Sequence, residues 1–423
     1  MVKKVLFNNL LWEALGKGLN LISVFIVNFI LANYLGPELF GSFSYVIAFS
    51  SGFLILSEFG LERIEIRETV KNEKIIESSL LIRLVASISS YSLLALCVSF
   101  LESDVDMQKM ILIFAVSNFA SIGYAFKNFF IGKFKNLYSS IALNFRDIFT
   151  LVSLLVLIYL KSSFSTILYY YLAAYFIEFI ILVFIFTTKF KSYKLKMDFS
   201  KTKYLITKSF PLFIAGLLIF SYKKMDLIII NYFLNDYETG IYSSAQKIAS
   251  ALLTSTMVII MVGGPILNKT IDTASYKKNR LLFFEIIILS SVLCSIIFFI
   301  FSENIIEMVF TKEYVKSIYP FKILIWKNVF ESIFLATGYI IIIQDLQKKA
   351  YLRNLIAATI SIISNLILIS NYGIIAASYI SLITYFFAGF VCNYFVKEYS
   401  FLNTITLEAL KFSEIKKHLQ KNG

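Results

Sequence analysis

Long apolar runs separated by short polar segments recur along the whole chain. An α-helix needs about 20 mainly apolar residues to cross the hydrocarbon core of a bilayer, within a range of about 17–25. The runs are continuous rather than alternating, which excludes a transmembrane β-barrel. Twelve runs have the length of a spanning helix: residues 10–33, 40–60, 79–101, 110–131, 138–160, 165–187, 207–234, 240–267, 282–301, 321–343, 354–370 and 373–395.

Basic residues alternate between the intervening loops in step with these spans. Cytoplasmic loops of membrane proteins carry an excess of Lys and Arg. If the N-terminus lies in the cytoplasm, the cytoplasmic segments hold 26 of these residues and the external loops hold 4. An error in the number of spans would scramble this alternation partway along the chain. The pattern therefore predicts an all-α membrane protein of twelve helices with both termini in the cytoplasm.

The composition supports a membrane protein and excludes several other classes. Of the 423 residues, 58% are hydrophobic and 16% charged, more apolar surface than a soluble fold of this size can bury. The net charge of +13 is spread over short membrane-proximal segments, which argues against nucleic-acid binding. Three well-separated cysteines and a single histidine, His418, leave no support for a disulfide, a metal site or histidine-based catalysis. The chain has no G-x-x-x-x-G-K-[ST] loop, so it binds no ATP by that route.

One short motif occurs twice, at an offset of 199 residues. Residues 35–44 and 234–243 both fit the pattern L-[GN]-x4-G-x-[FY]-S, and both follow an Asn-Tyr pair. Six spans separate the two copies, which gives them the same orientation in the membrane. The repeat predicts two parallel six-helix lobes around a central cavity. The corresponding division is an N-terminal lobe, a basic cytoplasmic linker, a C-terminal lobe and a basic cytoplasmic tail, at residues 1–188, 189–206, 207–395 and 396–423.

Several segments together resemble the Wzx-type oligosaccharide flippases, which belong to the superfamily of MATE drug exporters and lipid II flippases. They keep the order and spacing of that family along the whole chain. The segments are LANYLGPELFGSFSYVIAF (31–49), Glu58-Phe59-Gly60-Leu61, Ser209-Phe210-Pro211, KKMDLIIINYFLNDYETGIYSSAQKI (223–248), and Asn365-Leu366 through Asn371-Tyr372-Gly373-Ile374-Ile375-Ala376-Ala377.

The resemblance implies a transporter rather than an enzyme, in the inner membrane of a bacterium. Its substrate would be an undecaprenyl-diphosphate-linked oligosaccharide, moved from the cytoplasmic to the outer leaflet by alternating access. That substrate would feed O-antigen, capsule or a related surface polysaccharide. A polysaccharide polymerase and a chain-length regulator are the partner proteins expected beside it. No cofactor is expected, and H⁺ and Na⁺ both stay open as the coupling ion.

Ten cations lie within the predicted spans, where each charge is costly. Three of them have an acid three or four residues away on their own helix, in the pairs Glu13–Lys17, Lys223–Asp226 and Lys327–Glu331. These pairs either neutralise one another in lobe packing or take part in ion coupling. Lys127, Lys208 and Lys322 lie near helix ends, where their side chains reach the interface.

Arg146, Lys224 and Lys247 lie deep in their spans without an acid at those spacings. Asp147 neighbours Arg146, but adjacent helical residues point about 100° apart. We therefore expect these three cations, and then Arg83, to bind a diphosphate or acidic sugar on the cavity wall. The alternative for each is pairing across helices with Glu178, Asp147 or Glu285. Glu178 has no cation within a turn and is the first candidate for a protonatable coupling residue.

Two other function classes stay open at this stage. A MATE-type antiporter of drugs or organic cations shares the fold, but an acidic cavity would suit cationic cargo better than ten span cations against seven acids. A membrane glycan polymerase or lipid-linked glycosyltransferase usually needs a sizeable external domain. The longest external segment here is only residues 302–320.

Overall fold

The computed structural model describes residues 2–71, 74–190 and 198–422, without the side chains of 2–15, 17, 418, 419, 421 and 422. The described residues are almost entirely helical and contain no β-strand. They form two compact units, Met1–Leu217 and Leu218–Gly423. The boundary falls inside a helix of the seventh predicted span, and residues 191–197 of the predicted linker lie outside the described residues.

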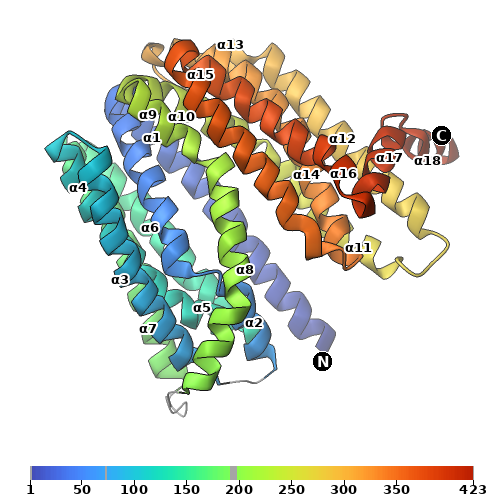
Figure 1. Ribbon diagram of the computed structural model, residues 1–423, viewed down its shortest axis with the longest axis horizontal. Coiled ribbons are helices and arrows are strands. Elements are labelled where there is room, and N and C mark those ends of the chain that lie inside the picture. Colours follow the sequence, from blue (N-terminus) through green and yellow to red (C-terminus); the bar gives the residue numbers. More distant parts are fainter. Residues whose placement is uncertain (1, 72–73, 191–197, 423) are drawn as a thin grey trace. The chain divides into compact units, whose positions relative to one another are not determined.

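Unit 1 is built around a long, broken first helix (Figure 1). This helix packs on α3 and α6, α6 packs on α7, and α2 packs on α5. The elements of the unit are α1 (Val2–Glu58), α2 (Glu62–Val70), α3 (Ile76–Leu101), α4 (Val105–Ala115), η1 (Val116–Gly123), α5 (Tyr124–Gly132), α6 (Asn136–Tyr159), α7 (Phe164–Lys189) and most of α8 (Phe199–Lys223).

Unit 2 contains the end of α8 and the remaining elements. Helix α14 packs on α10, α12 and α15, and α9 packs on α15. The elements are α9 (Met225–Phe233), α10 (Asp236–Ala251), α11 (Leu253–Lys269), α12 (Tyr276–Ile300), α13 (Ser302–Val309), η2 (Lys312–Ser317), α14 (Ile318–Ile343), η3 (Gln347–Lys349), α15 (Ala350–Phe386), the π-helical turn η4 (Phe387–Val391), α16 (Cys392–Phe395), η5 (Lys397–Tyr399), α17 (Ser400–Ala409) and α18 (Ser413–Asn422).

The repeated sequence motif interrupts a helix in both units. In unit 1, Gly36 has a φ of 72°, a conformation that suits glycine, and Pro37 then opens the next helical segment. In unit 2, extended Asn235 ends the α9 segment and its side chain accepts the Glu238 N–H (2.8 Å) as the N-cap of α10. The two copies of the motif therefore have the same structural role, because one helical segment ends and the next begins at each of them.

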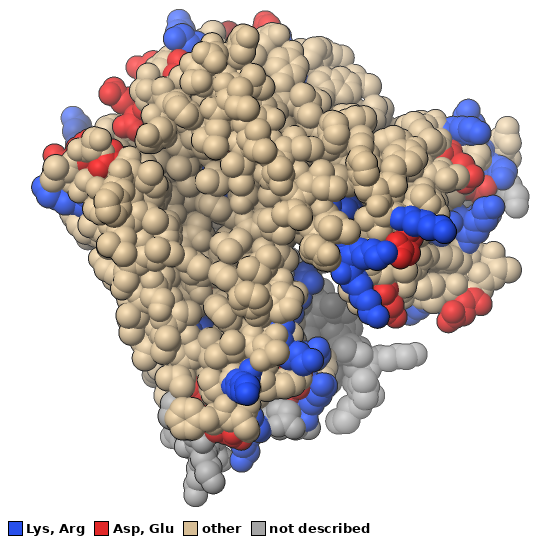
Figure 2. All heavy atoms as spheres, viewed as in Figure 1, with Lys and Arg blue, Asp and Glu red and all other residues tan. Residues whose placement is uncertain are grey.

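Ten helical ranges among the described residues are long and apolar enough to cross a membrane. The first and last of them, residues 18–70 and 347–395, contain the breaks at Gly36 and Gly373, each near the boundary between two predicted spans. Twelve spans and the orientation of the termini stay predictions. In the view of Figure 2, most of the surface of each unit carries no charge, and the charged side chains gather at its ends.

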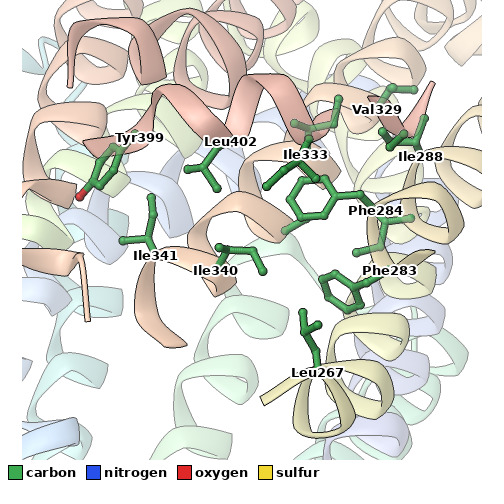
Figure 3. Close-up of a cluster of buried hydrophobic side chains, with 14 of the residues drawn as sticks. Leu267, Phe283, Phe284, Ile288, Val329, Ile333, Ile340, Ile341, Tyr399 and Leu402 are labelled. Carbon is green, nitrogen blue, oxygen red and sulfur yellow. The ribbon is translucent and has the colours of Figure 1, made fainter. Parts of the chain in front are cut away.

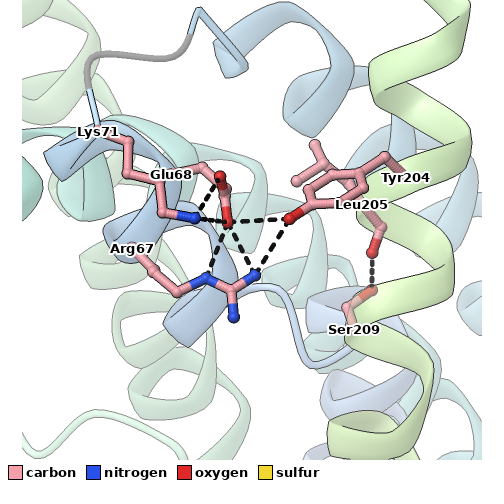
Figure 4. A network of polar contacts seen from close by, with 6 residues as sticks. All are labelled: Arg67, Glu68, Lys71, Tyr204, Leu205 and Ser209. Carbon is pink, nitrogen blue, oxygen red and sulfur yellow. Dashed lines mark hydrogen bonds and ion pairs between the residues drawn. The ribbon is translucent and has the colours of Figure 1, made fainter.

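Helix α8 is fixed to α2 within unit 1 by a polar network centred on Glu68 (Figure 4). The Glu68 carboxylate accepts hydrogen bonds from Arg67 (2.8 Å) and from the Tyr204 hydroxyl of α8 (3.1 Å). Next to this network, Gly60 has a φ of +64°, and an added Cβ would lie 2.5 Å from the backbone nitrogen of Phe213. Only glycine permits this close approach between the α1–α2 corner and α8.

The C-terminal residues, predicted from the sequence as a polar tail, form helices that pack on unit 2. Tyr399 and Leu402 join a buried cluster with Phe284 of α12 and with Ile333 and Ile340 of α14 (Figure 3). The sequence did not indicate this packing, because only one side of α17 is apolar, as in any helix that packs on a larger core.

The N-terminus of α18 is capped from α12. The Glu285 carboxylate, which is fully buried, accepts the backbone N–H groups of Glu414 (3.1 Å) and Ile415 (2.9 Å). The first N–H groups of a helix have no partner within the helix, and the helix dipole favours negative charge there. Glu285 was predicted as a possible partner for a membrane cation, and in the structure it satisfies this helix end instead.

Candidate functional site

In unit 2, a break between α8 and α9 brings several charged residues together. The span predicted as continuous over 207–234 is interrupted at Lys224, whose φ of −137° lies outside the helical range. Lys223 and Asp226 therefore do not share a helix face, and the predicted ion pair between them is wrong. The Lys223 ammonium lies instead 3.5 Å from Oε1 of Glu331 on α14.

Asp226 is held by neutral donors rather than by a lysine. Its Oδ2 accepts hydrogen bonds from the Tyr242 hydroxyl (2.6 Å) and from Gln246 (2.9 Å), both on α10. Its Oδ1 accepts the N–H of Leu227 (2.9 Å) at the start of α9. Three hydrogen bonds therefore fix the position of the buried Asp226 side chain at the break.

Glu331 lies beside Lys327 on the same helix, as the i,i+4 spacing predicts. The Lys327 ammonium is 3.2 Å from Oε2 of Glu331, and both side chains are buried. Lys327 also lies over the ring of Tyr385, 5.2 Å from its centroid. The pair is thus enclosed by protein, with an aromatic face supplying part of the cation's solvation.

Lys224 and Lys247 complete the cluster. Lys224 is exposed, interacts electrostatically with Lys223, Lys327 and Asp226, and makes no ion pair among the described residues. Lys247 is half-buried and interacts electrostatically with Lys224. Around the carboxylates of Asp226 and Glu331 lie three lysines, Lys223, Lys224 and Lys327, so groups that are formally positive outnumber the negative ones here by one. A local excess of positive charge favours the binding of an anion.

At the equivalent positions of the repeat, unit 1 has apolar residues in place of the polar and charged residues of unit 2. At the offset of 199 residues, Tyr242, Gln246 and Lys247 correspond to Phe43, Ile47 and Ala48 of unit 1. Phe43 is buried against the ring of Tyr171, with 5.2 Å between the ring centroids. The equivalent helix of unit 1 therefore packs through apolar groups at the positions where unit 2 places polar and charged ones.

Unit 1 has a different cluster, in which one arginine lies between two acids. Arg146 donates to Oε2 of Glu178 on α7 (2.7 Å) and to Oδ1 of Asp147 (2.9 Å). The predicted separation of Arg146 from its neighbour Asp147 is wrong, because the long arginine side chain curves back toward the next residue. The three groups carry a surplus of one negative charge, the reverse of the unit 2 cluster.

Two further features of this cluster concern the acids. Asn20 of α1 donates to Oδ2 of Asp147 (2.8 Å), a partner that no sequence pattern had indicated. Oε1 of Glu178 is buried and has no hydrogen-bond partner among the described residues. Arg146 and Asp147 also line a cavity in unit 1, together with Tyr171 and Tyr175.

Arg83 lies in neither cluster. Its side chain is 1% exposed and contacts both oxygens of Glu65, at 2.9 and 2.8 Å. Asn128 (2.5 Å) and Ser79 also donate to Glu65, and Arg83 donates to the carbonyl of Ser121 (3.2 Å). Arg83 thus pairs across helices, which was the alternative considered for each of these cations. Its partner Glu65 lies between two predicted spans, in a segment predicted to be a cytoplasmic loop.

Two residues of the predicted site set cannot be placed, and one buried cation was missed. The side chains of Glu13 and Lys17 lie outside the described residues. Arg353 had been counted as a loop cation, yet it is 3% exposed and donates to Thr337 (2.8 Å) and to the carbonyl of Ala388 (3.2 Å) in the π-helical turn. Its position at the edge of a predicted span gave no signal of this burial.

A sequence profile of the family described as polysaccharide biosynthesis protein matches residues 6–271, more than half of the chain. The chain belongs to this family. No curated protein matches its sequence. The profile covers unit 1 from residue 6 onward and the unit 2 segment that contains Lys223, Lys224, Asp226 and Lys247.

Solved structures similar to this family member are transporters and a flippase, not enzymes. The inward closed conformation of the lipid II flippase MurJ has a TM-score of 0.73 at 14% identity, covering 97% of this chain and 93% of that one. An inward-facing multidrug resistance MATE transporter has a TM-score of 0.69 at 11% identity, covering 91% and 96%. A transporter of the same superfamily from Pyrococcus furiosus, described as having a binding pocket of reversed polarity, has a TM-score of 0.62 at 11% identity, covering 92% and 93%. These similarities establish the fold.

Proposed function

We propose that this protein is a flippase for undecaprenyl-diphosphate-linked oligosaccharide repeat units. It moves them by alternating access from the cytoplasmic to the outer leaflet of a bacterial inner membrane, where they enter O-antigen, capsule or a related polysaccharide. A polymerase and a chain-length regulator would use the product. The observation that carries the proposal is the cation surplus in unit 2, formed by Lys223, Lys224 and Lys327 around the carboxylates of Asp226 and Glu331.

A diphosphate needs compensating charge to leave water for the interior of a membrane protein. The cluster offers one formal positive charge beyond those its two carboxylates balance, and Lys224 and Lys223 are exposed. Lysine suits this task because its ammonium is a compact charge on a flexible stem, which can follow a moving phosphate. Membership of the polysaccharide biosynthesis family supports a glycan as the group attached to that diphosphate.

The test is a deletion strain and its complementation. Loss of the gene should trap lipid-linked repeat units on the cytoplasmic face and abolish one surface glycan. Complementation with Lys224→Ala should restore protein level but little glycan. Lys208→Ala is the matched control, because Lys208 is an exposed cation on α8 that lies over the ring of Tyr204 (5.9 Å). Normal surface glycan in the deletion strain, with no second transporter present, would contradict the proposal.

For energy coupling, the Arg146 cluster of unit 1 supports H⁺ rather than Na⁺. The Arg146 guanidinium already contacts one oxygen of Asp147 and one of Glu178, so a positive charge stands where a sodium ion would bind these two acids. The unpartnered Oε1 of buried Glu178 is the position at which we place the transported proton.

A MATE-type antiporter of organic cations is the second candidate. The observation that favours it is the surplus of one negative charge in the Arg146 cluster, which borders a cavity. If this function is correct, expression of the protein should reduce the susceptibility of a drug-sensitive strain to cationic dyes. The flippase proposal expects no such change.

A further inference from the structure

Glu331 lies between two lysines that come from different elements. Its Oε1 is 3.5 Å from Nζ of Lys223, at the end of α8, and its Oε2 is 3.2 Å from Nζ of Lys327 on α14. Charged N–H···O bonds are usually about 2.7–2.9 Å long. Oε2 also has no hydrogen bond of normal geometry among the described residues. The carboxylate therefore neutralises two ammonium groups without being held tightly by either.

Glu65 of unit 1 is a buried acid of the same chain whose two oxygens are both held by short hydrogen bonds, and it serves as a comparison for Glu331. Its two oxygens receive Arg83 at 2.9 and 2.8 Å, and Asn128 donates at 2.5 Å. Both Glu65 and Arg83 are almost fully buried. Glu331 is equally buried, but its partner Lys223 has a side chain that is 40% exposed. The contact of Lys223 with Glu331 is therefore exchangeable, and the Glu65 contacts are not.

The helix break makes this exchange geometrically easy. Lys223 is the last residue of α8, and Lys224 has left the helical conformation. The four-carbon stem of a lysine lets its ammonium move several ångströms without any change of the backbone. Lys223 can thus leave Glu331 for another anion while α8, α9 and α14 stay in place.

We infer that Glu331 is a surrogate anion, which holds Lys223 when no substrate is bound and yields it to the substrate diphosphate. This inference rests on the proposed function. Without Glu331, the empty transporter would have to carry two uncompensated ammonium groups in a low-dielectric region, at high energetic cost. With Glu331, the diphosphate must displace an internal competitor, so it binds less tightly and leaves more readily on the far side. Glu331 acts as a positioning residue that sets affinity and release.

The test measures binding of inorganic pyrophosphate to the purified full-length protein by titration calorimetry. Glu331→Gln keeps the size of the side chain and removes the competing charge, so it should bind pyrophosphate about tenfold or more tightly than the wild type. In proteoliposomes the same variant should lower both the KM and the turnover rate for the lipid-linked substrate. A merely structural role would not move these two quantities in that combination.

Glu303→Gln is the control. Glu303 is exposed and pairs with Lys322 at 2.8 Å, and this hydrogen bond holds its pKa below the ordinary value, so the variant also removes a full negative charge from unit 2. Its pyrophosphate affinity should equal that of the wild type. Should Glu331→Gln fail to fold, Glu331→Asp serves instead, because the shorter side chain lengthens both contacts and should also tighten binding.

Lys224→Ala separates the two proposals. If Lys224→Ala weakens pyrophosphate binding while Glu331→Gln leaves it unchanged or weaker, the surrogate role is wrong and the cationic site stands. If the wild type itself shows no binding that depends on Lys224, the diphosphate site and the role of Glu331 are both overturned. Tighter binding by Glu331→Gln alone, with Glu303→Gln unchanged, supports the inference.

Discussion

Arg83 and Glu65 form a two-pronged ion pair inside unit 1, with contacts of 2.9 and 2.8 Å between side chains that are 1% and 2% exposed. Arg83→Ala would leave the Glu65 charge buried and uncompensated, which costs about 3–5 kcal/mol. We expect a clear fall in the thermal unfolding temperature of the purified protein. Arg67→Ala is the control, because Arg67 is half-exposed and its pair with Glu68 contributes about 0–1 kcal/mol. Equal stability of the two variants would contradict the structural role of Arg83.

Gly60 is a position at which the fold permits only glycine. Its φ of +64° and the 2.5 Å separation between an added Cβ and the nitrogen of Phe213 both exclude alanine. The left-handed conformation alone costs about 1–2 kcal/mol for a non-glycine residue, and the clash with α8 adds to it. Gly60→Ala should therefore lower the yield of folded protein. Gly18→Ala, where nothing lies within 4 Å of the added Cβ, should keep the wild-type yield in the same fluorescence size-exclusion assay.

Glu285 holds α18 through two backbone N–H groups, so its removal should release the C-terminal helix first. In Glu285→Ala, Glu414 and Ile415 lose the acceptor of their N–H groups. Limited proteolysis should then cut the chain between α17 and α18 faster than in the wild type. Glu398→Ala removes an exposed acid paired with Lys349 (2.6 Å) and should leave the cleavage rate unchanged. Cleavage of both variants at the wild-type rate would mean that packing alone holds the helix.

The sequence predicted those features of the fold that depend on local composition. Apolar run lengths indicated the helices, and two boundaries between predicted runs, at 34–39 and 235–239, contain the breaks that the structure places at Gly36 and Asn235. The i,i+4 spacing also brought Lys327 and Glu331 together. Each of these follows from neighbours within a few residues, where helix geometry fixes the distance.

The remaining features depend on tertiary packing and could not be predicted in this way. The helix break at Lys224 contains neither proline nor glycine, so nothing in the apolar pattern marks it, and it invalidates the expected pair of Lys223 with Asp226. Asn20 and Asp147 are 127 residues apart in the chain and meet only because α1 packs on α6. The tail helices were missed because their apolar residues cover one face rather than forming a continuous run.

Proton coupling at Glu178 can be tested by its response to a pH gradient. Glu178→Gln keeps the shape of the side chain but can no longer gain or lose a proton. In proteoliposomes, a gradient of pH should accelerate flipping by the wild type and leave the residual flux of Glu178→Gln unchanged. Asp106→Asn is the control, because Asp106 is an exposed acid of unit 1 paired with Lys109 (3.1 Å), and it should respond as the wild type does. A Glu178→Gln variant that still follows the pH gradient would place the proton site elsewhere, and a wild type driven by Na⁺ alone would replace H⁺ with Na⁺ as the coupling ion.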